Sequence, residues 1–91
     1  MEDPQPIDKS SPEYVWLQVA NAIAADIESG KLPAGARLTG ERALAEAYGV
    51  AIGTVRRAVR ELRERGAVIT VPARGTFVVG APGEGHRAHS G

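Results

Sequence analysis

The sequence predicts one mainly α-helical domain that ends in a small β-hairpin. Its 91 residues are too few for several domains. Apolar residues recur at helical spacing in three segments before Gly66, whereas two short β-branched runs separated by a proline-containing turn follow it. We therefore expect three helices and then a hairpin within residues 11–79. Residues 1–10 and 80–91 are rich in proline, glycine and polar residues, and they are expected to be disordered.

The first helix is expected to begin at Ser11–Glu13, where a hydroxyl residue, a proline and an acid follow one another as at many helix N-termini. One face of this helix carries an apolar stripe, formed by Trp16, Val19, Ala20, Ile23 and Ile27. Gly30 is the residue type that most often ends a helix. We expect the stripe to face the core, and Trp16 to be a core residue rather than a platform on which bases stack.

The second helix is expected to follow a loop that contains a short strand near Arg37–Leu38. Thr39 is placed to cap this helix, which runs to about Ala47. Leu44 and Ala45 are expected to face inward.

The third predicted helix runs from Ile52 to Arg65 and has two unlike sides. Its apolar stripe consists of Val55, Ala58, Val59 and Leu62. A neighbouring face carries arginines at i, i+4 and i+7, which are Arg56, Arg60 and Arg63. Two strands are predicted after it, Ala67–Val71 and Thr76–Val79, joined by a turn with Arg74 at its tip.

The net charge of zero hides a separation of charge along the chain. Residues 1–36 contain two lysines and six acidic residues, a net charge of −4. Residues 37–79 contain eight arginines and four glutamates, a net charge of +4. Arginine is the better bidentate partner for phosphate and guanine. A solvated helical face explains such a run of arginines as well as nucleic-acid binding does, so charge alone leaves both interpretations open.

Two short helices joined by a glycine-containing turn, the second with outward arginines, form a helix-turn-helix, and the hairpin after them is placed as a wing. Residues 14–79 resemble the DNA-binding domain of GntR-type bacterial transcription regulators. The matching segments are Gln18–Ala20, Ile23, Ile27–Gly30, Leu32–Leu38, Glu41–Ala45, Gly49–Val50, Thr54–Ala58, Leu62, Gly66 and Arg74–Val78. The resemblance implies a winged helix-turn-helix that reads the major groove with helix 52–65 and the minor groove with the wing at 72–76.

The resemblance also implies which residues contact DNA. Contact positions of the family are matched here by Arg42, Thr54, Arg56, Arg74, Gly75 and Thr76. The third helix adds Ile52, Gly53, Arg57 and Arg60 to the expected DNA-binding set. Ala73 stands where the family's wing has its first glycine.

The start of the third helix departs from the family pattern. Ala51–Gly53 stand where members commonly have a serine or threonine followed by an arginine that reads a guanine, and Thr39–Gly40 replace a proline and a serine. The change removes an N-cap worth about 1 kcal/mol of helix stability. It also removes a base contact worth roughly 1–3 kcal/mol of discrimination. We expect DNA binding with an altered site preference, in which Ile52 either touches a thymine methyl or packs against the second helix, and Gly53 allows close approach to the backbone.

The resemblance further implies a homodimer, at least on DNA, bound to a palindromic operator and acting as a repressor. Regulators of this type usually carry a larger C-terminal effector domain, whereas this sequence continues for twelve residues after Val79. The chain is therefore expected to be either a stand-alone winged helix or a fragment without its sensor. A small-molecule effector is not expected to bind it, because a domain of this size rarely encloses a pocket.

Other classes of function have little support in the sequence. The chain has no cysteine, and His86 and His89 lack a third ligand, so no thiol nucleophile, metal site, cofactor or enzymatic activity is expected. No apolar run approaches the roughly 18 residues that cross a membrane. The acidic, proline-rich N-terminus is unlike a secretion signal, so a cytoplasmic protein is expected. The alternative function is a winged-helix module that binds a protein without specific DNA binding, although the arginines favour DNA.

Overall fold

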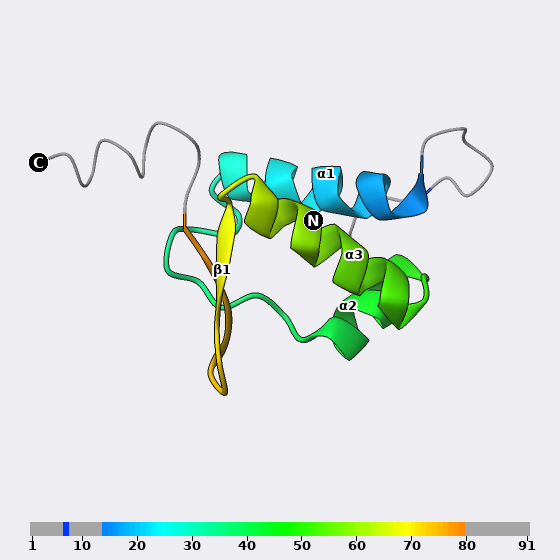
Figure 1. The fold of residues 1–91 in the computed structure, drawn as a ribbon. Coiled ribbons are helices and arrows are strands. Elements are labelled where there is room, and N and C mark those ends of the chain that lie inside the picture. The colour runs from blue at the N-terminus through cyan, green and yellow to red at the C-terminus, as the bar shows by residue number, and fades with distance from the viewer. Residues whose placement is uncertain (1–6, 8–13, 80–91) are drawn as a thin grey trace, which may run out of the picture.

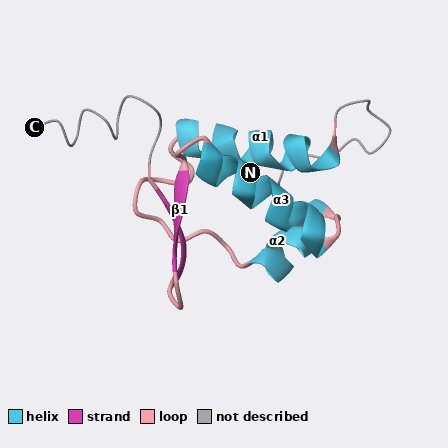
Figure 2. Cartoon of the chain, in the orientation of Figure 1, coloured by secondary structure: helices cyan, strands magenta, loops and turns pink. Residues whose placement is uncertain are grey.

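Five elements make up the computed structural model, which describes Ile7 and residues 14–79. They are α1 (Val15–Glu28), α2 (Glu41–Tyr48), α3 (Ile52–Glu64), β1 (Val68–Val71) and β2 (Gly75–Val78). Figure 1 shows that α1 lies along α3, that α2 lies at the beginning of α3, and that the hairpin extends away from the helices at the other end of α3. Three helices and one hairpin therefore form the expected winged arrangement (Figure 2).

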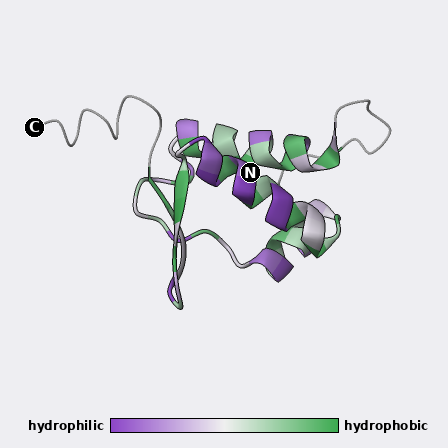
Figure 3. Ribbon diagram, viewed as in Figure 1, coloured by the Kyte–Doolittle hydropathy of each residue, from purple (hydrophilic) through white to green (hydrophobic). Residues whose placement is uncertain are grey.

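The core is built around the apolar side of α3. Val55, Ala58 and Leu62 have no exposed surface. The other buried apolar residues are Val59 of α3 itself and residues from every remaining element and from the loop before α2, which are Val19, Ala20, Ile23, Ile27, Leu38, Leu44, Ala45, Val68 and Val78. Figure 3 shows hydrophilic residues along the side of α3 that faces the viewer. The two-sided character predicted for this helix is therefore confirmed.

Two helix starts differ from the prediction. The first helix begins at Val15 rather than at Ser11–Glu13, because Tyr14 has the extended backbone of an N-cap residue, with φ −58° and ψ 140°. Ser11–Glu13 themselves lie outside the described residues. The second helix is capped by Gly40 and not by Thr39, and no side chain closes its N-terminus. Thr39 fails as the cap because it lies one residue too early.

Trp16 is not the core residue that its place on the apolar stripe predicts. It is half-buried, and its ring stacks on that of Tyr14 with centroids 6.0 Å apart. The stripe buries Val19 and Ile23 completely or nearly so, whereas Trp16 lies where α1 begins and the core ends. Ile7 packs against the same core, and the rest of the expected N-terminal arm lies outside the described residues.

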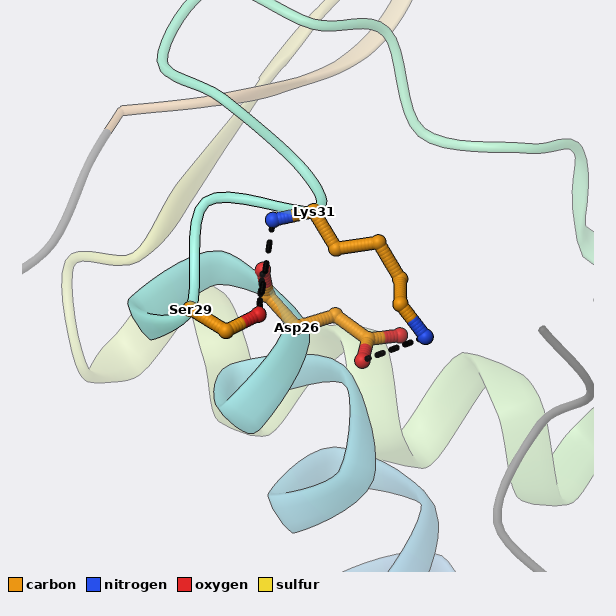
Figure 4. A network of polar contacts seen from close by, with 3 residues as sticks. All are labelled: Asp26, Ser29 and Lys31. Carbon is orange, nitrogen blue, oxygen red and sulfur yellow. Dashed lines mark hydrogen bonds and ion pairs between the residues drawn. The ribbon is translucent and has the colours of Figure 1, made fainter. Parts of the chain in front are cut away.

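The end of α1 is held by a local polar network (Figure 4). The Ser29 hydroxyl donates to the carbonyl oxygen of Asp26 at 3.2 Å and accepts from the backbone N–H of Lys31 at 3.4 Å. The Lys31 ammonium lies 3.7 Å from the Asp26 carboxylate. These contacts lie where the chain leaves α1 and enters the loop that leads to α2.

The loop before α2 is joined to the hairpin. The strands are antiparallel, with Val68 opposite Val78 and Val71 opposite Gly75. Arg37 forms an isolated bridge with Phe77, where the sequence predicts a short strand near Arg37–Leu38. The extended pairing is present, but it is limited to this single bridge. The backbone N–H of Leu38 donates to the Thr76 carbonyl oxygen at 2.7 Å. The hairpin is therefore anchored by Leu38, which lies 38 positions before its hydrogen-bond partner Thr76 in the sequence. Within the described part of the chain, no helix has the length and apolar character needed to span a membrane.

Tyr48, the last residue of α2, gives a test of this packing through pH. Burial of its phenol, and to a smaller extent the negative charge of Asp26, raises the pKa of Tyr48 above the usual 10.0. The folded state therefore holds this proton more tightly than the unfolded state, and the stability so gained is lost as the pH rises through the raised folded pKa.

We expect the urea midpoint of the wild type to fall above about pH 10, and Tyr48→Phe to reduce that fall. Tyr14→Phe, at an exposed tyrosine, is the matched control. An identical fall in the wild type and Tyr48→Phe would contradict the burial of this phenol.

Candidate nucleic-acid interface

A tight turn sets α3 against α2. Gly49 ends α2 in the left-handed conformation, with φ 69°, which costs a glycine little because it has no Cβ. The backbone N–H of Val50 then donates to the carbonyl oxygen of Ala45 at 3.0 Å. Ala51 caps α3 without a side-chain hydrogen bond, as its alanine side chain dictates. The turn therefore places the start of α3 beside α2 with its outer face open.

Two arginines of α3 lie on the open side of this helix. Arg56 and Arg60 are both exposed. Arg56 Nε lies 2.9 Å from a carboxylate oxygen of Glu41 at the start of α2, but the two side chains remain 62% and 44% exposed. A surface ion pair of this kind is worth about 0–1 kcal/mol, so it orients Arg56 without removing the charge from the surface. The cationic face of the predicted helix is therefore present and accessible.

The beginning of α3 combines apolar and polar residues. Ile52 is half-buried and packs against the core. Packing against the second helix in particular and contact with a thymine methyl both stay predictions. Gly53 is exposed and Thr54 is half-buried. A shallow depression of about 340 Å³ lies beside them, lined by Arg42, Ala45, Glu46, Gly49, Val50 and Ile52. Arg42 itself is exposed on α2. The exposed residues of this region therefore come from both helices of the motif.

The tip of the hairpin contains a strained residue. Arg74 is exposed in the turn, as predicted. Ala73 has φ 66°, the left-handed conformation, and it is the non-glycine residue with positive φ in the described chain. This conformation costs an alanine roughly 1–2 kcal/mol. A glycine adopts this conformation at little cost because it has no Cβ, so an alanine holds this position at the cost of strain.

Arg37 packs against the hairpin, although the sequence does not place it among the expected site residues. Gly75 has φ 127°, and a Cβ on it would lie 2.6 Å from Nε of Arg37. The guanidinium therefore lies directly against the hairpin where the glycine has no side chain. Gly75 is expected to contact DNA, but the Arg37 side chain covers the side of Gly75 where a Cβ would lie. The sequence gives no local signal for the contact, because the two residues are brought together by the bridge to Phe77.

Unlike the other residues expected to contact DNA, Arg57 packs against Trp16 of α1. Its guanidinium carbon lies 4.1 Å from the centroid of the Trp16 ring, within the range of a cation–π interaction. Arg57 is half-buried, whereas its neighbour Arg56 is exposed. The structure thus places Arg57 between α3 and α1, so its side chain contributes to holding these helices together.

The hairpin, the turn and the exposed face of α3 together define a winged helix-turn-helix domain. Residues 16–78 match the family model described as bacterial regulatory proteins, gntR family. The chain belongs to this family.

Similar proteins include the putative HTH-type transcriptional regulator RmpR of Mycobacterium gastri, 47% identical over 84% of this chain and 29% of that protein. The HTH-type transcriptional repressor NagR of Bacillus subtilis is 35% identical over 79% of this chain and 30% of its own. This chain thus spans about three tenths of the length of these relatives. Among solved structures, the DNA-binding domain of AraR in complex with operator ORE1 is similar, with a TM-score of 0.71, 29% identity and coverage of 80% of this chain and 89% of that chain.

The strain at the hairpin tip can be measured directly. We expect Ala73→Gly to stabilise the protein by about 0.5–1 kcal/mol in urea unfolding, since relief of the left-handed strain exceeds the added entropy of the unfolded chain. Ala34→Gly, in an exposed loop without positive φ, is the matched control and should be slightly destabilising. Equal effects of the two substitutions would show that Ala73 is not strained.

The contact of Arg57 with the single tryptophan of the chain has an optical signature. Arg57→Ala should change the emission of Trp16 and lower the free energy of unfolding by about 0.5–1 kcal/mol, whereas Arg57→Lys should keep part of the interaction. Unchanged emission together with an unchanged unfolding midpoint in Arg57→Ala would contradict this placement.

Proposed function

We propose that the chain is a sequence-specific, double-stranded-DNA-binding regulator of transcription. The observation that carries the proposal is the division of α3 into a fully buried apolar side and an exposed arginine side. A helix fixed in this way offers a charged face that fits the major groove, while the hairpin tip reaches the adjacent minor groove. The fold shared with AraR, whose DNA-binding domain was solved on its operator, supports the same use.

In this proposal some exposed residues bind the DNA backbone and position the protein, whereas others contact bases and provide specificity. Arg42 binds a phosphate from α2, and Arg56 reads a base from α3. Glu41 holds the Arg56 guanidinium in place before binding. The remaining contacts come from Ile52, Gly53, Thr54 and Arg60 in α3 and from Arg74, Gly75 and Thr76 in the hairpin. Arg57 packs on Trp16 and contributes to DNA binding only by stabilising the packing of α3 against α1.

The wider role follows from the family and is part of the proposal. A palindromic operator is bound by two copies of the chain, since two-fold symmetry in the protein matches two-fold symmetry in the site. Repression is the proposed outcome, as the name of NagR indicates for that relative. The activity is binding rather than catalysis, and a DNA partner places it in the cytoplasm of a bacterial cell. A small-molecule effector is not assigned to residues 14–79.

Selection of bound duplexes from a random pool is the experiment that tests the proposal. Recovery of a two-fold symmetric sequence supports it, and its half-site spacing reports how the two copies are arranged. Recovery of unrelated sequences with equal affinity would overturn sequence-specific binding.

Substitutions of Arg56 and of Arg42 should have different effects on the affinity for the selected duplex and for random DNA. Arg56→Ala should lower affinity for the selected duplex by roughly 1–3 kcal/mol and affinity for random DNA much less, because it removes a base contact. Arg42→Ala should weaken both alike and reduce the slope of log affinity against log salt by about 0.9, the contribution of one phosphate. Fluorescence anisotropy over a range of salt concentrations measures both effects.

Arg65→Ala is the control that removes the same charge elsewhere. Arg65 pairs with Glu61 at 2.9 Å and donates to Asn21 of α1 at 2.9 Å, so it lies on the side of the molecule that faces α1. It should leave discrimination between the two DNAs unchanged. Identical losses for Arg56→Ala, Arg42→Ala and Arg65→Ala would reduce the effect to net charge and refute the assigned roles.

A further inference from the structure

One face of the hairpin is part of the core near the helices and becomes polar toward the turn. The cross-strand partners Val68 and Val78 are both buried. Since side chains two residues apart share a face, Thr70 and its partner Thr76 extend this face toward the turn. Their hydroxyl oxygens lie 3.0 Å apart. On this face of the hairpin, the pair of threonines therefore follows the pair of buried valines in the direction of the turn.

Arg63, in the last turn of α3, reaches this pair of threonines. Its Nη1 donates to Oγ1 of Thr70 at 3.0 Å. A hydroxyl has one proton and two lone pairs, so Thr70 can accept from Arg63 and donate to Thr76 at the same time. The three side chains thus form a chain of hydrogen bonds from α3 across both strands, and linked hydrogen bonds strengthen one another.

We propose that Arg63 is a positioning residue, which fixes the angle between α3 and the hairpin through Thr70. This inference rests on the proposed function, in which α3 and the hairpin must enter neighbouring grooves together. Two strands of four residues form a hairpin that is marginal by itself. A hairpin already held at the correct angle loses less conformational freedom when DNA binds. Arg63, which shares a face with Arg56 and Arg60, therefore has a different task from theirs.

Substitutions at Thr70 test this role without changing charge. Thr70 is exposed, so replacing it does not disturb the core. Thr70→Val keeps the shape and the preference for strand, but it removes the oxygen that accepts from Arg63. Thr70→Ser keeps the hydroxyl and is the matched control. In the free 91-residue protein, residual dipolar couplings and amide relaxation should show a hairpin that moves relative to α3 in Thr70→Val and remains fixed in Thr70→Ser.

The same variants are then compared on the selected duplex. Thr70→Val should lose about fivefold in affinity, the order of one net hydrogen bond, with reduced protection of the minor groove and an unchanged salt slope. Protection of the major groove should persist. Arg63→Met should lose minor-groove protection in the same way, and adding Thr70→Val to it should cause no further loss, because both substitutions break one chain of hydrogen bonds.

Two outcomes separate this inference from the proposed function. A hairpin as well ordered in Thr70→Val as in Thr70→Ser would overturn the positioning role, whatever the affinity for DNA. A wild type without preference for any duplex would overturn the proposed function, while the measurement on the free protein would still decide the role of Arg63. Loss of affinity and of salt slope in Arg63→Met, with none in Thr70→Val, would make Arg63 a phosphate contact and would also overturn the inference.

Discussion

Everything in this structure depends on α3 packing its apolar side completely while keeping Arg56 and Arg60 in solvent. Val55, Ala58 and Leu62 have no exposed surface, and α3 packs against α1, α2 and β1. This burial fixes the rotation of the helix about its own axis, because turning it would expose the valines and bury the charges, which is costly in both directions. The arginine face is therefore directed by the core rather than by any contact of its own.

The contacts around the arginines adjust this face and leave its charge available. The pair between Arg56 and Glu41 is exposed, so exchanging the carboxylate for a phosphate or a base edge costs little. Arg63 and Arg37 connect in different ways to the hairpin, one through Thr70 and the other across Gly75. The hairpin is thus held by an arginine of α3 on one face and by an arginine of the loop before α2 on the other, in addition to the backbone bond from Leu38 to Thr76.

The elements with local signals were predictable from the sequence. The stripe of α3, the left-handed end of α1 at Gly30 and the strand pair after Gly66 follow from periodicity and residue type alone. The wrong prediction at Trp16 and the omission of Arg37 depend on tertiary contacts, which periodicity does not contain. Trp16 shares the spacing of the buried stripe but lies beyond the end of the core, where Arg57 covers it. The part of Arg37 in the hairpin could not be found, since a loop residue meets a strand far along the chain. The strain at Ala73 was visible only as a missing glycine.

The most direct measurement of the central claim is a map of amide chemical shifts as a duplex recovered by selection is added to the protein. The account predicts that the largest changes fall at the start of α3, at the start of α2 and in the turn around Arg74. The residues of α1 that surround Trp16 should change least. Large changes at Tyr14 and Trp16, with the start of α3 unaffected, would mean that the molecule binds through α1 and would contradict the account.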